Sequence, residues 1–134
     1  MLQNALVPVD GSQYMTGLVA HAIGFGKRTH CTLTFLYVVD IPSGASPAEI
    51  EVWKSASIKL PDECREKAAA EGISAKSRTE VGSPAETIVT VAEREKFDII
   101  IIGSKGHSRL KSLVVGSVAD QVMEHAPCPV LLAR

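Results

Sequence analysis

The amino-acid sequence predicts an α/β domain in which helices cover both faces of a five-stranded, mainly parallel sheet, a three-layer α/β/α sandwich. Short apolar segments rich in β-branched residues alternate along the chain with segments whose apolar residues recur at helical spacing. The tetrapeptide Ser-Pro-Ala-Glu occurs at residues 46–49 and 83–86, and its order suits the first turn of a helix. Residues 99–102 are all isoleucine, which predicts a central strand covered on both faces.

Five short segments are predicted to be strands. The first, residues 6–9, ends at the polar turn of residues 10–12. The apolar run of residues 31–39 predicts a buried strand, whereas residues 73–81 alternate only weakly and predict a more exposed one. Residues 98–103 and 129–133 are the expected fourth and closing strands.

Four helical segments are expected between the strands. The first uses Ser12 as its N-cap, and the second runs from Ser46 to a stop at Gly72. Pro61 should kink or split the second, and Trp53 is expected to pack it against the sheet. The expected apolar faces are Met15, Leu18, Val19, Ala22, Ile23 and Gly26 in the first, and Ile50, Trp53, Ser57, Leu60, Cys64 and Ala68 in the second.

The third helical segment is expected to start at Ser83 and to end near Phe97. The last helix has Ser117 and Asp120 at capping spacing. The expected apolar faces are Ala85, Ile88, Val91 and Ala92 in the third, and Val118, Ala119, Val122 and Met123 in the last.

Composition limits the possible classes of protein. A chain of 134 residues, 46% hydrophobic and 22% charged, suits one domain over residues 1–134. A net charge of -1 argues against a nucleic-acid or anionic-membrane partner. There is neither a secretion signal nor an apolar run of roughly 18 residues, so we expect a cytoplasmic protein. Cys31, Cys64 and Cys128 lack metal or redox spacing and suit reduced, apolar filling residues.

In an open parallel sheet, ligands bind beyond the carboxyl ends of the strands, where the strand order reverses. The loops to examine are therefore those after the first and fourth strands. In the longer loop, glycines at 103, 106 and 116 allow backbone N–H groups to converge on an anion, and the last of these starts a helix. Hydroxyl and cationic side chains accompany them: Ser104, Ser108, Ser112, Ser117, Lys105, Arg109 and Lys111. A solvated loop that needs glycine only to turn is equally compatible with this spacing.

Two stricter nucleotide-binding motifs are absent. The segment of residues 24–29, GFGKRT, is the nearest match to both. For a P-loop ending at Gly26, the first glycine would have to stand five positions earlier, where the chain has His21. For a dinucleotide-binding motif, Thr29 stands where the third glycine would be. The sequence therefore supports neither a P-loop hydrolase nor a Rossmann dehydrogenase.

Gly103, Gly106, Gly116 and Ser117 together form Gly-x2-Gly-x9-Gly-Ser, which resembles the ATP-binding signature of the universal stress protein family. Four further segments resemble the family's landmarks in the same order: VPVDGS at residues 7–12, VGSPAETI at 81–88, FDIIIIGSKG at 97–106 and CPVLLAR at 128–134. The resemblance covers essentially the whole chain.

The resemblance implies a Rossmann-like sheet of the adenine-nucleotide alpha-hydrolase type with strand order 3-2-1-4-5, and a homodimer formed through the last strand. It implies ATP as ligand, with any Mg²⁺ bound mainly to the phosphates. The implied ATP-binding residues are Pro8, Val9 and Asp10 around the nucleoside, Val38 at the adenine edge, Ile102 and Gly103 beside the ribose, and Gly106, Gly116, Ser117 and Val118 around the phosphates. Ser104, Lys105 and Arg109 are candidate phosphate contacts.

The resemblance leads us to expect an ATP-dependent switch or sensor in the stress response, acting on a protein partner that the sequence does not identify. Two alternatives stay open: an interaction module of the same fold that does not depend on ATP, and a slow ATPase. His107 has no evident carboxylate partner and the other histidines lack metal-ligand spacing, so no catalytic residue and no metal ligand is predicted.

Overall fold

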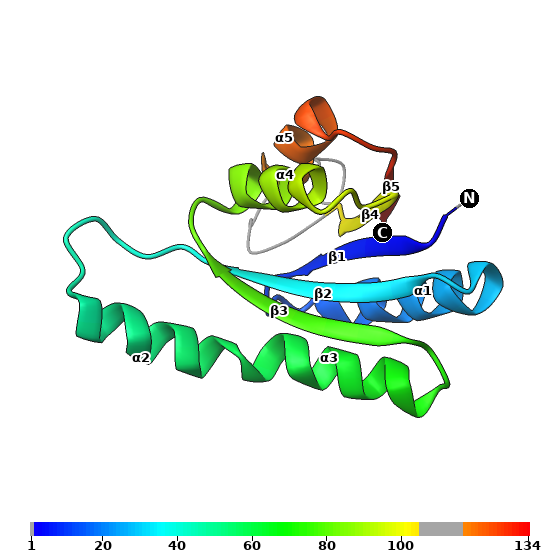
Figure 1. Cartoon of the computed structure of the whole chain (residues 1–134), viewed down its shortest axis with the longest axis horizontal. Helices are drawn as coiled ribbons and strands as arrows, with labels where there is room; N and C mark the ends of the chain where they lie inside the picture. Colours follow the sequence, from blue (N-terminus) through cyan, green and yellow to red (C-terminus); the bar gives the residue numbers. More distant parts are fainter. Residues whose placement is uncertain (1, 105–116) are drawn as a thin grey trace.

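The computed structural model describes residues 2–104 and 117–134, which form five strands and five helices (Figure 1). The strands are β1 (Asn4–Val9), β2 (Thr32–Val39), β3 (Ala75–Val81), β4 (Ile99–Gly103) and β5 (Val130–Ala133). The helices are α1 (Met15–Thr29), α2 (Pro47–Ser57), α3 (Lys59–Ala70), α4 (Pro84–Arg94) and α5 (Ser117–His125). Among these helices, none combines the length and the apolar character needed to cross a membrane. The predicted α/β class and the five predicted strands are confirmed.

The five strands form one sheet in the order β3-β2-β1-β4-β5, and every neighbouring pair is parallel. This order confirms the one that the family resemblance implied. The chain builds β2 and β3 on one side of β1 and then crosses to build β4 and β5 on the other. The strand order therefore reverses between β1 and β4, and a crevice opens at the carboxyl ends of these two strands.

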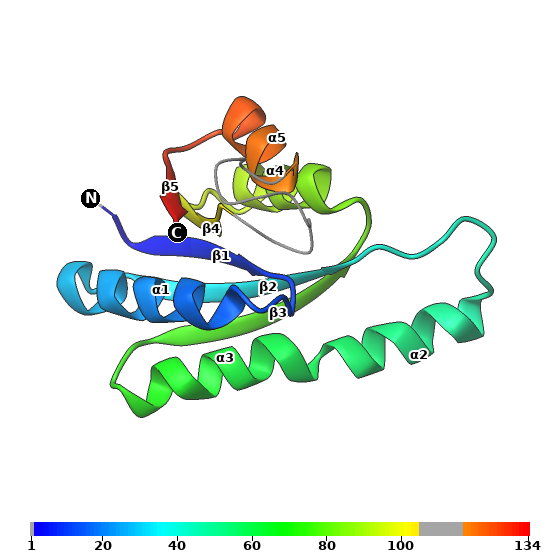
Figure 2. The ribbon, with the colours of Figure 1, turned by 180° about the vertical axis from the view of Figure 1, so that it is seen from behind.

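Strand β4 shows how both faces of the sheet are covered. Ile99 and Ile101 belong to the apolar cluster beneath α1 and α3, whereas Ile100 and Ile102 belong to the cluster beneath α4 and α5. Figures 1 and 2 show the corresponding layers on opposite faces of the sheet. Successive side chains of a strand point to opposite faces, so four isoleucines in a row need an apolar layer on each side. The predicted central, doubly covered strand is confirmed.

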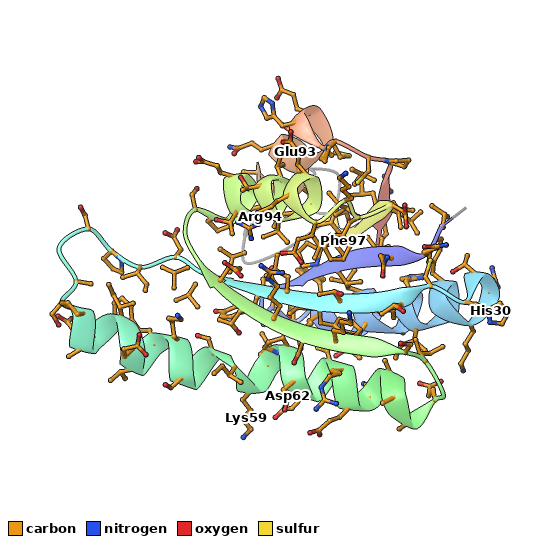
Figure 3. The ribbon with its side chains drawn as sticks, viewed as in Figure 1. His30, Lys59, Asp62, Glu93, Arg94 and Phe97 are labelled. Atoms are coloured by element: carbon orange, nitrogen blue, oxygen red, sulfur yellow. The ribbon has the colours of Figure 1, made fainter. Side chains whose placement is uncertain are left out.

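The predicted helix from Ser46 to Gly72 is split in two. Ser46 Oγ accepts the N–H of Glu49 at 3.2 Å and Glu49 Oε1 accepts the N–H of Ser46 at 3.2 Å, so the start of α2 is the capping box that the sequence predicted. Pro61 has no N–H to donate to the C=O of Ser57, and α2 ends at that serine. Helix α3 continues in nearly the same direction, with Lys59 pointing away from the sheet (Figure 3).

The end of α4 was predicted too late. The helix ends at Arg94 rather than near Phe97, because Lys96 adopts the left-handed conformation at φ 54°. The N–H of Phe97 then donates to the C=O of Ala92, which closes the helix end. Figure 3 shows Phe97 beyond the labelled last turn of α4.

The predicted apolar face of α5 is only half correct. Ala119 and Val122 are buried against α4, but Val118 is 36% exposed and Met123 is 39% exposed. Among the described residues of this helix, only Ala119 and Val122 are buried, which makes a narrow stripe. The described part of α5 begins at Ser117, and the residue before it lies outside the described residues.

Candidate functional site

A cavity of about 770 Å³ opens at the carboxyl end of the sheet. The described residues that line it come from the ends of β1, β2 and β4, from the first turns of α1, α4 and α5, and from α2. Small-molecule sites in proteins commonly enclose about 300–1,000 Å³, so this cavity has room for a ligand of the size of a nucleotide. It lies at the point of strand-order reversal, where the sequence predicted a binding site.

The structure brings together eight of the residues that the sequence singled out. These residues line the same cavity although they come from three strands, the turn after β1 and one helix: Pro8, Val9, Asp10, Val38, Ile102, Gly103, Ser117 and Val118. Ser104 is not among the lining residues; it is buried, and its N–H donates to the C=O of Ala133 at 2.8 Å. The predicted residues Lys105, Gly106, Arg109 and Gly116 lie outside the described residues.

Asp10 sits at the end of β1 in a turn that holds its carboxylate at the cavity. Its Oδ1 accepts the N–H of Ser12 at 2.9 Å, and Ser12 Oγ accepts the N–H of Tyr14 at 3.3 Å. Gly11 between them has φ 75°, a conformation that residues with a Cβ adopt at a cost. This turn also corrects the prediction that Ser12 caps α1, because the two hydrogen bonds span residues 10–14, Tyr14 is the N-cap and the helix starts only at Met15.

The backbone of β2 supplies a second polar group at the cavity. In a parallel strand the N–H and C=O of alternate residues point to alternate neighbours. The N–H of Leu33 donates to Ser74 on the β3 side and the C=O of Val39 accepts from Gly82 on the same side, so the polar groups of Val38 point to the β1 side. The last residue of β2 that pairs with β1 is Tyr37, opposite Val9. The C=O of Val38 therefore points past the end of β1 toward the cavity.

The apolar wall contributed by α2 was not foreseen. Trp53 was expected to pack the helix against the sheet, but it is 37% exposed and lines the cavity together with Ala56 and Ser57. Helical spacing shows that these side chains share a face, yet it does not show whether the face meets a sheet or a ligand site. The other lining residues that the sequence analysis did not assign to the site are Ser12, Tyr14, Met15, Leu18, Leu36, Tyr37, Val39, Asp40, Pro42, Pro84, Ile88 and Ala119.

The chemistry of the described lining is mixed but ordered. Buried aliphatic side chains such as Leu36, Ile88 and Ile102 form its deeper part. The carboxylates of Asp10 and Asp40 stand at the strand ends, and the N-terminus of α5 contributes N–H groups that have no partner within the helix. An apolar pocket with a few polar groups at one rim suits a flat, partly polar ring, and a helix N-terminus favours a negative group.

This combination of a doubly wound parallel sheet with a crevice at its switch point defines an α/β protein of the nucleotide-binding type of fold. The model of the universal stress protein family matches residues 1–134, and the chain belongs to that family.

Individual relatives agree with this membership. A universal stress protein of Methanocaldococcus jannaschii is 35% identical in an alignment that covers 100% of this chain and 83% of the relative. The solved structure of UspA from Lactobacillus plantarum matches with a TM-score of 0.84 and 30% identity, covering 98% of this chain and 97% of that one. A universal stress protein solved in complex with cAMP matches with a TM-score of 0.76 and 25% identity, covering 98% of this chain and 97% of that one.

Proposed function

We propose that this protein binds ATP in the crevice and works as a nucleotide-dependent switch or sensor of the stress response in the cytoplasm. The observation that carries the proposal is the convergence of eight predicted contact residues on one cavity of about 770 Å³. The relative solved with cAMP supports it, because that ligand contains the same adenine and ribose groups.

The crevice offers suitable partners for each part of the nucleotide. The C=O of Val38 can accept a hydrogen bond from the adenine amino group, and the carboxylate of Asp10 can accept one from the base or a ribose hydroxyl. The buried aliphatic residues suit the apolar ring. The phosphates then run toward Ser117, where the N–H groups and the dipole of α5 favour negative charge.

The remaining phosphate contacts that we propose are made by the loop that carries Gly106 and Gly116, outside the described residues. Mg²⁺ suits this arrangement as a companion of the phosphates, because it usually keeps several waters and takes few protein ligands. Asp10 and Asp40 are the carboxylates of the described lining that could hold one of those waters.

Calorimetric titration with ATP in the presence of Mg²⁺ tests the proposal, with Asp10→Asn as the informative variant. Asparagine keeps an oxygen that can accept the N–H of Ser12, so the turn is preserved while the charge is lost. A hydrogen bond to a charged group contributes about 1.5–3 kcal/mol, so the affinity for ATP should fall about 10- to 150-fold. Asp62→Asn removes a carboxylate that does not line the cavity and serves as the control. Absence of binding to the wild-type protein at millimolar ATP would contradict the proposal.

We also propose that two copies associate through β5. This strand lies at an edge of the sheet, and Leu131 on it is 40% exposed. An open edge strand with an exposed apolar side chain is a suitable surface for pairing with a second copy. Light scattering should give twice the chain mass for the wild-type protein and the chain mass for Leu131→Lys. Equal masses for the two proteins would contradict this mode of association.

A further inference from the structure

Helix α2 is the least buried helix in the described part of the chain. None of its residues is buried, whereas each of the other described helices buries at least two. Figures 1 and 2 show that α2 extends past the carboxyl end of the sheet, where the long connection from β2 leads into it. Packing in the apolar core therefore does not account for the apolar residues of α2.

One face of α2 is turned toward the cavity. Trp53, Ala56 and Ser57 line the cavity, and their spacing of three and four residues places them side by side on the helix. Val52 is 65% exposed and does not line the cavity. The side chains of Trp53 and Val52 thus lie on different faces of the helix.

The cavity face of α2 is apolar in character. Ser57 Oγ donates to the C=O of Trp53 at 2.6 Å, so the hydroxyl proton is directed at the helix itself. The indole of Trp53 and the methyl group of Ala56 are then the main surfaces that this wall presents. Trp53 remains 37% exposed beside a cavity of about 770 Å³. Covering such a ring with another flat ring removes apolar surface from water and allows stacking.

The groups that can recognise the edge of a base lie on other elements. Asp10 follows β1 directly, Val38 is the penultimate residue of β2, and Asp40 follows β2 directly. A nucleobase carries its hydrogen-bonding atoms on its edge and presents apolar faces above and below. An edge directed at the strand ends leaves one face of the base for the side chain of Trp53.

We propose that Trp53 is a specificity-determining residue that covers a face of the bound base and makes the site prefer purine over pyrimidine nucleotides. The inference rests on the proposed nucleotide binding and deepens it. A purine has two fused rings and a pyrimidine one, so a purine covers more of the indole. The polar groups at the strand ends distinguish bases by the hydrogen-bonding atoms on their edges. Trp53 adds a preference for the base with the larger ring system.

Calorimetric titration with ATP and with CTP tests this role in the wild-type protein, Trp53→Ala, Trp53→Phe and Val52→Ala. Stacking of a base on an aromatic residue contributes about 1–3 kcal/mol, so Trp53→Ala should weaken ATP binding about 5- to 150-fold. CTP binding should weaken less, so the ratio of the two affinities should fall. Trp53→Phe should recover part of the affinity and of the ratio, which a loss of helix packing alone would not produce. Val52→Ala should match the wild type.

Fluorescence supplies an independent readout, because Trp53 is the one tryptophan of the chain. ATP should change the emission of the wild-type protein along the same saturation curve that calorimetry gives, and inorganic tripolyphosphate should leave the emission unchanged. This measurement needs no variant, so it tests the contact between Trp53 and the bound base even if Trp53→Ala fails to fold; the purine preference is then tested by the ATP and CTP affinities of the wild-type protein and Trp53→Phe.

The possible outcomes separate the two proposals. If the wild-type protein binds ATP but its emission does not respond, or if Trp53→Ala keeps the affinity ratio of Val52→Ala, the role of Trp53 is overturned and the proposed function stands. If the wild-type protein binds no adenine nucleotide in calorimetry, the proposed function fails and the role of Trp53 fails with it.

Discussion

Gly11 holds the turn that presents Asp10 to the crevice, and its replacement by alanine should cost stability through the backbone alone. A Cβ built on Gly11 would lie 3.5 Å from Leu60 Cδ2, an ordinary contact, so no steric clash is expected. The φ of 75° is the unfavourable feature, because the left-handed conformation costs a residue with a Cβ about 1–2 kcal/mol. Gly11→Ala should therefore lower the free energy of unfolding by about 1–2 kcal/mol.

Gly24 in the middle of α1 is the matched control. A Cβ there would meet nothing within 4 Å, and the residue sits in a helix, where alanine is favoured over glycine by about 1 kcal/mol. Gly24→Ala should therefore raise the free energy of unfolding by up to about 1 kcal/mol. Urea denaturation followed by circular dichroism measures both variants. Gly11→Ala should also bind ATP more weakly, because the strained turn moves Asp10. If both variants shift stability in the same direction, the conformational account of the turn is wrong.

Two further predictions concern the sheet. The N–H groups of Gln3 and Asn4 each donate to Asp98 Oδ2 at 2.9 Å and lower the pKa of this carboxyl below its ordinary 3.8. Folding favours the ionised carboxyl, so its contribution to the free energy of unfolding is present above pH 3.8 and is lost as the pH falls through the lowered pKa. The urea midpoint of the wild-type protein should therefore fall in this acidic range, and Asp98→Asn should make that fall shallower. An equally steep fall in the variant would refute the prediction. Ile100 has no exposed surface and lies in β4, the strand between β1 and β5. Ile100→Ala should therefore lower the free energy of unfolding by about 2–5 kcal/mol in urea denaturation, and a decrease of less than about 1 kcal/mol would contradict its central packing.

Local sequence signals predicted most of the fold because several of them agree along this chain. The capping box at Ser46 and the missing N–H of Pro61 act within one or two turns of helix, so the sequence predicts their effects directly. The run of isoleucines at residues 99–102 leaves a strand no exposed face, which places it in the centre of a sheet.

The features that the sequence did not predict depend on distant packing. Periodicity grouped Trp53 with the apolar residues of its helix. Its position at the cavity depends on the direction of α2 relative to the sheet, which the break between α2 and α3 at Ile58 helps to determine. Val118 and Met123 carry apolar side chains that α5 leaves exposed, since only a narrow stripe of that helix is covered. For Val38 the family resemblance implied a backbone contact with adenine, and the structure adds only the direction in which its C=O points.

Photoaffinity labelling with 8-azido-ATP tests most directly whether ATP occupies the crevice. After irradiation and proteolysis, mass spectrometry should find the label on peptides that contain cavity-lining residues of β1, β2, β4, α2 or α5, and an excess of ATP should abolish it. Label that excess ATP does not displace, or label confined to β3 or α3, which contribute no residue to the described lining, would contradict the proposed site.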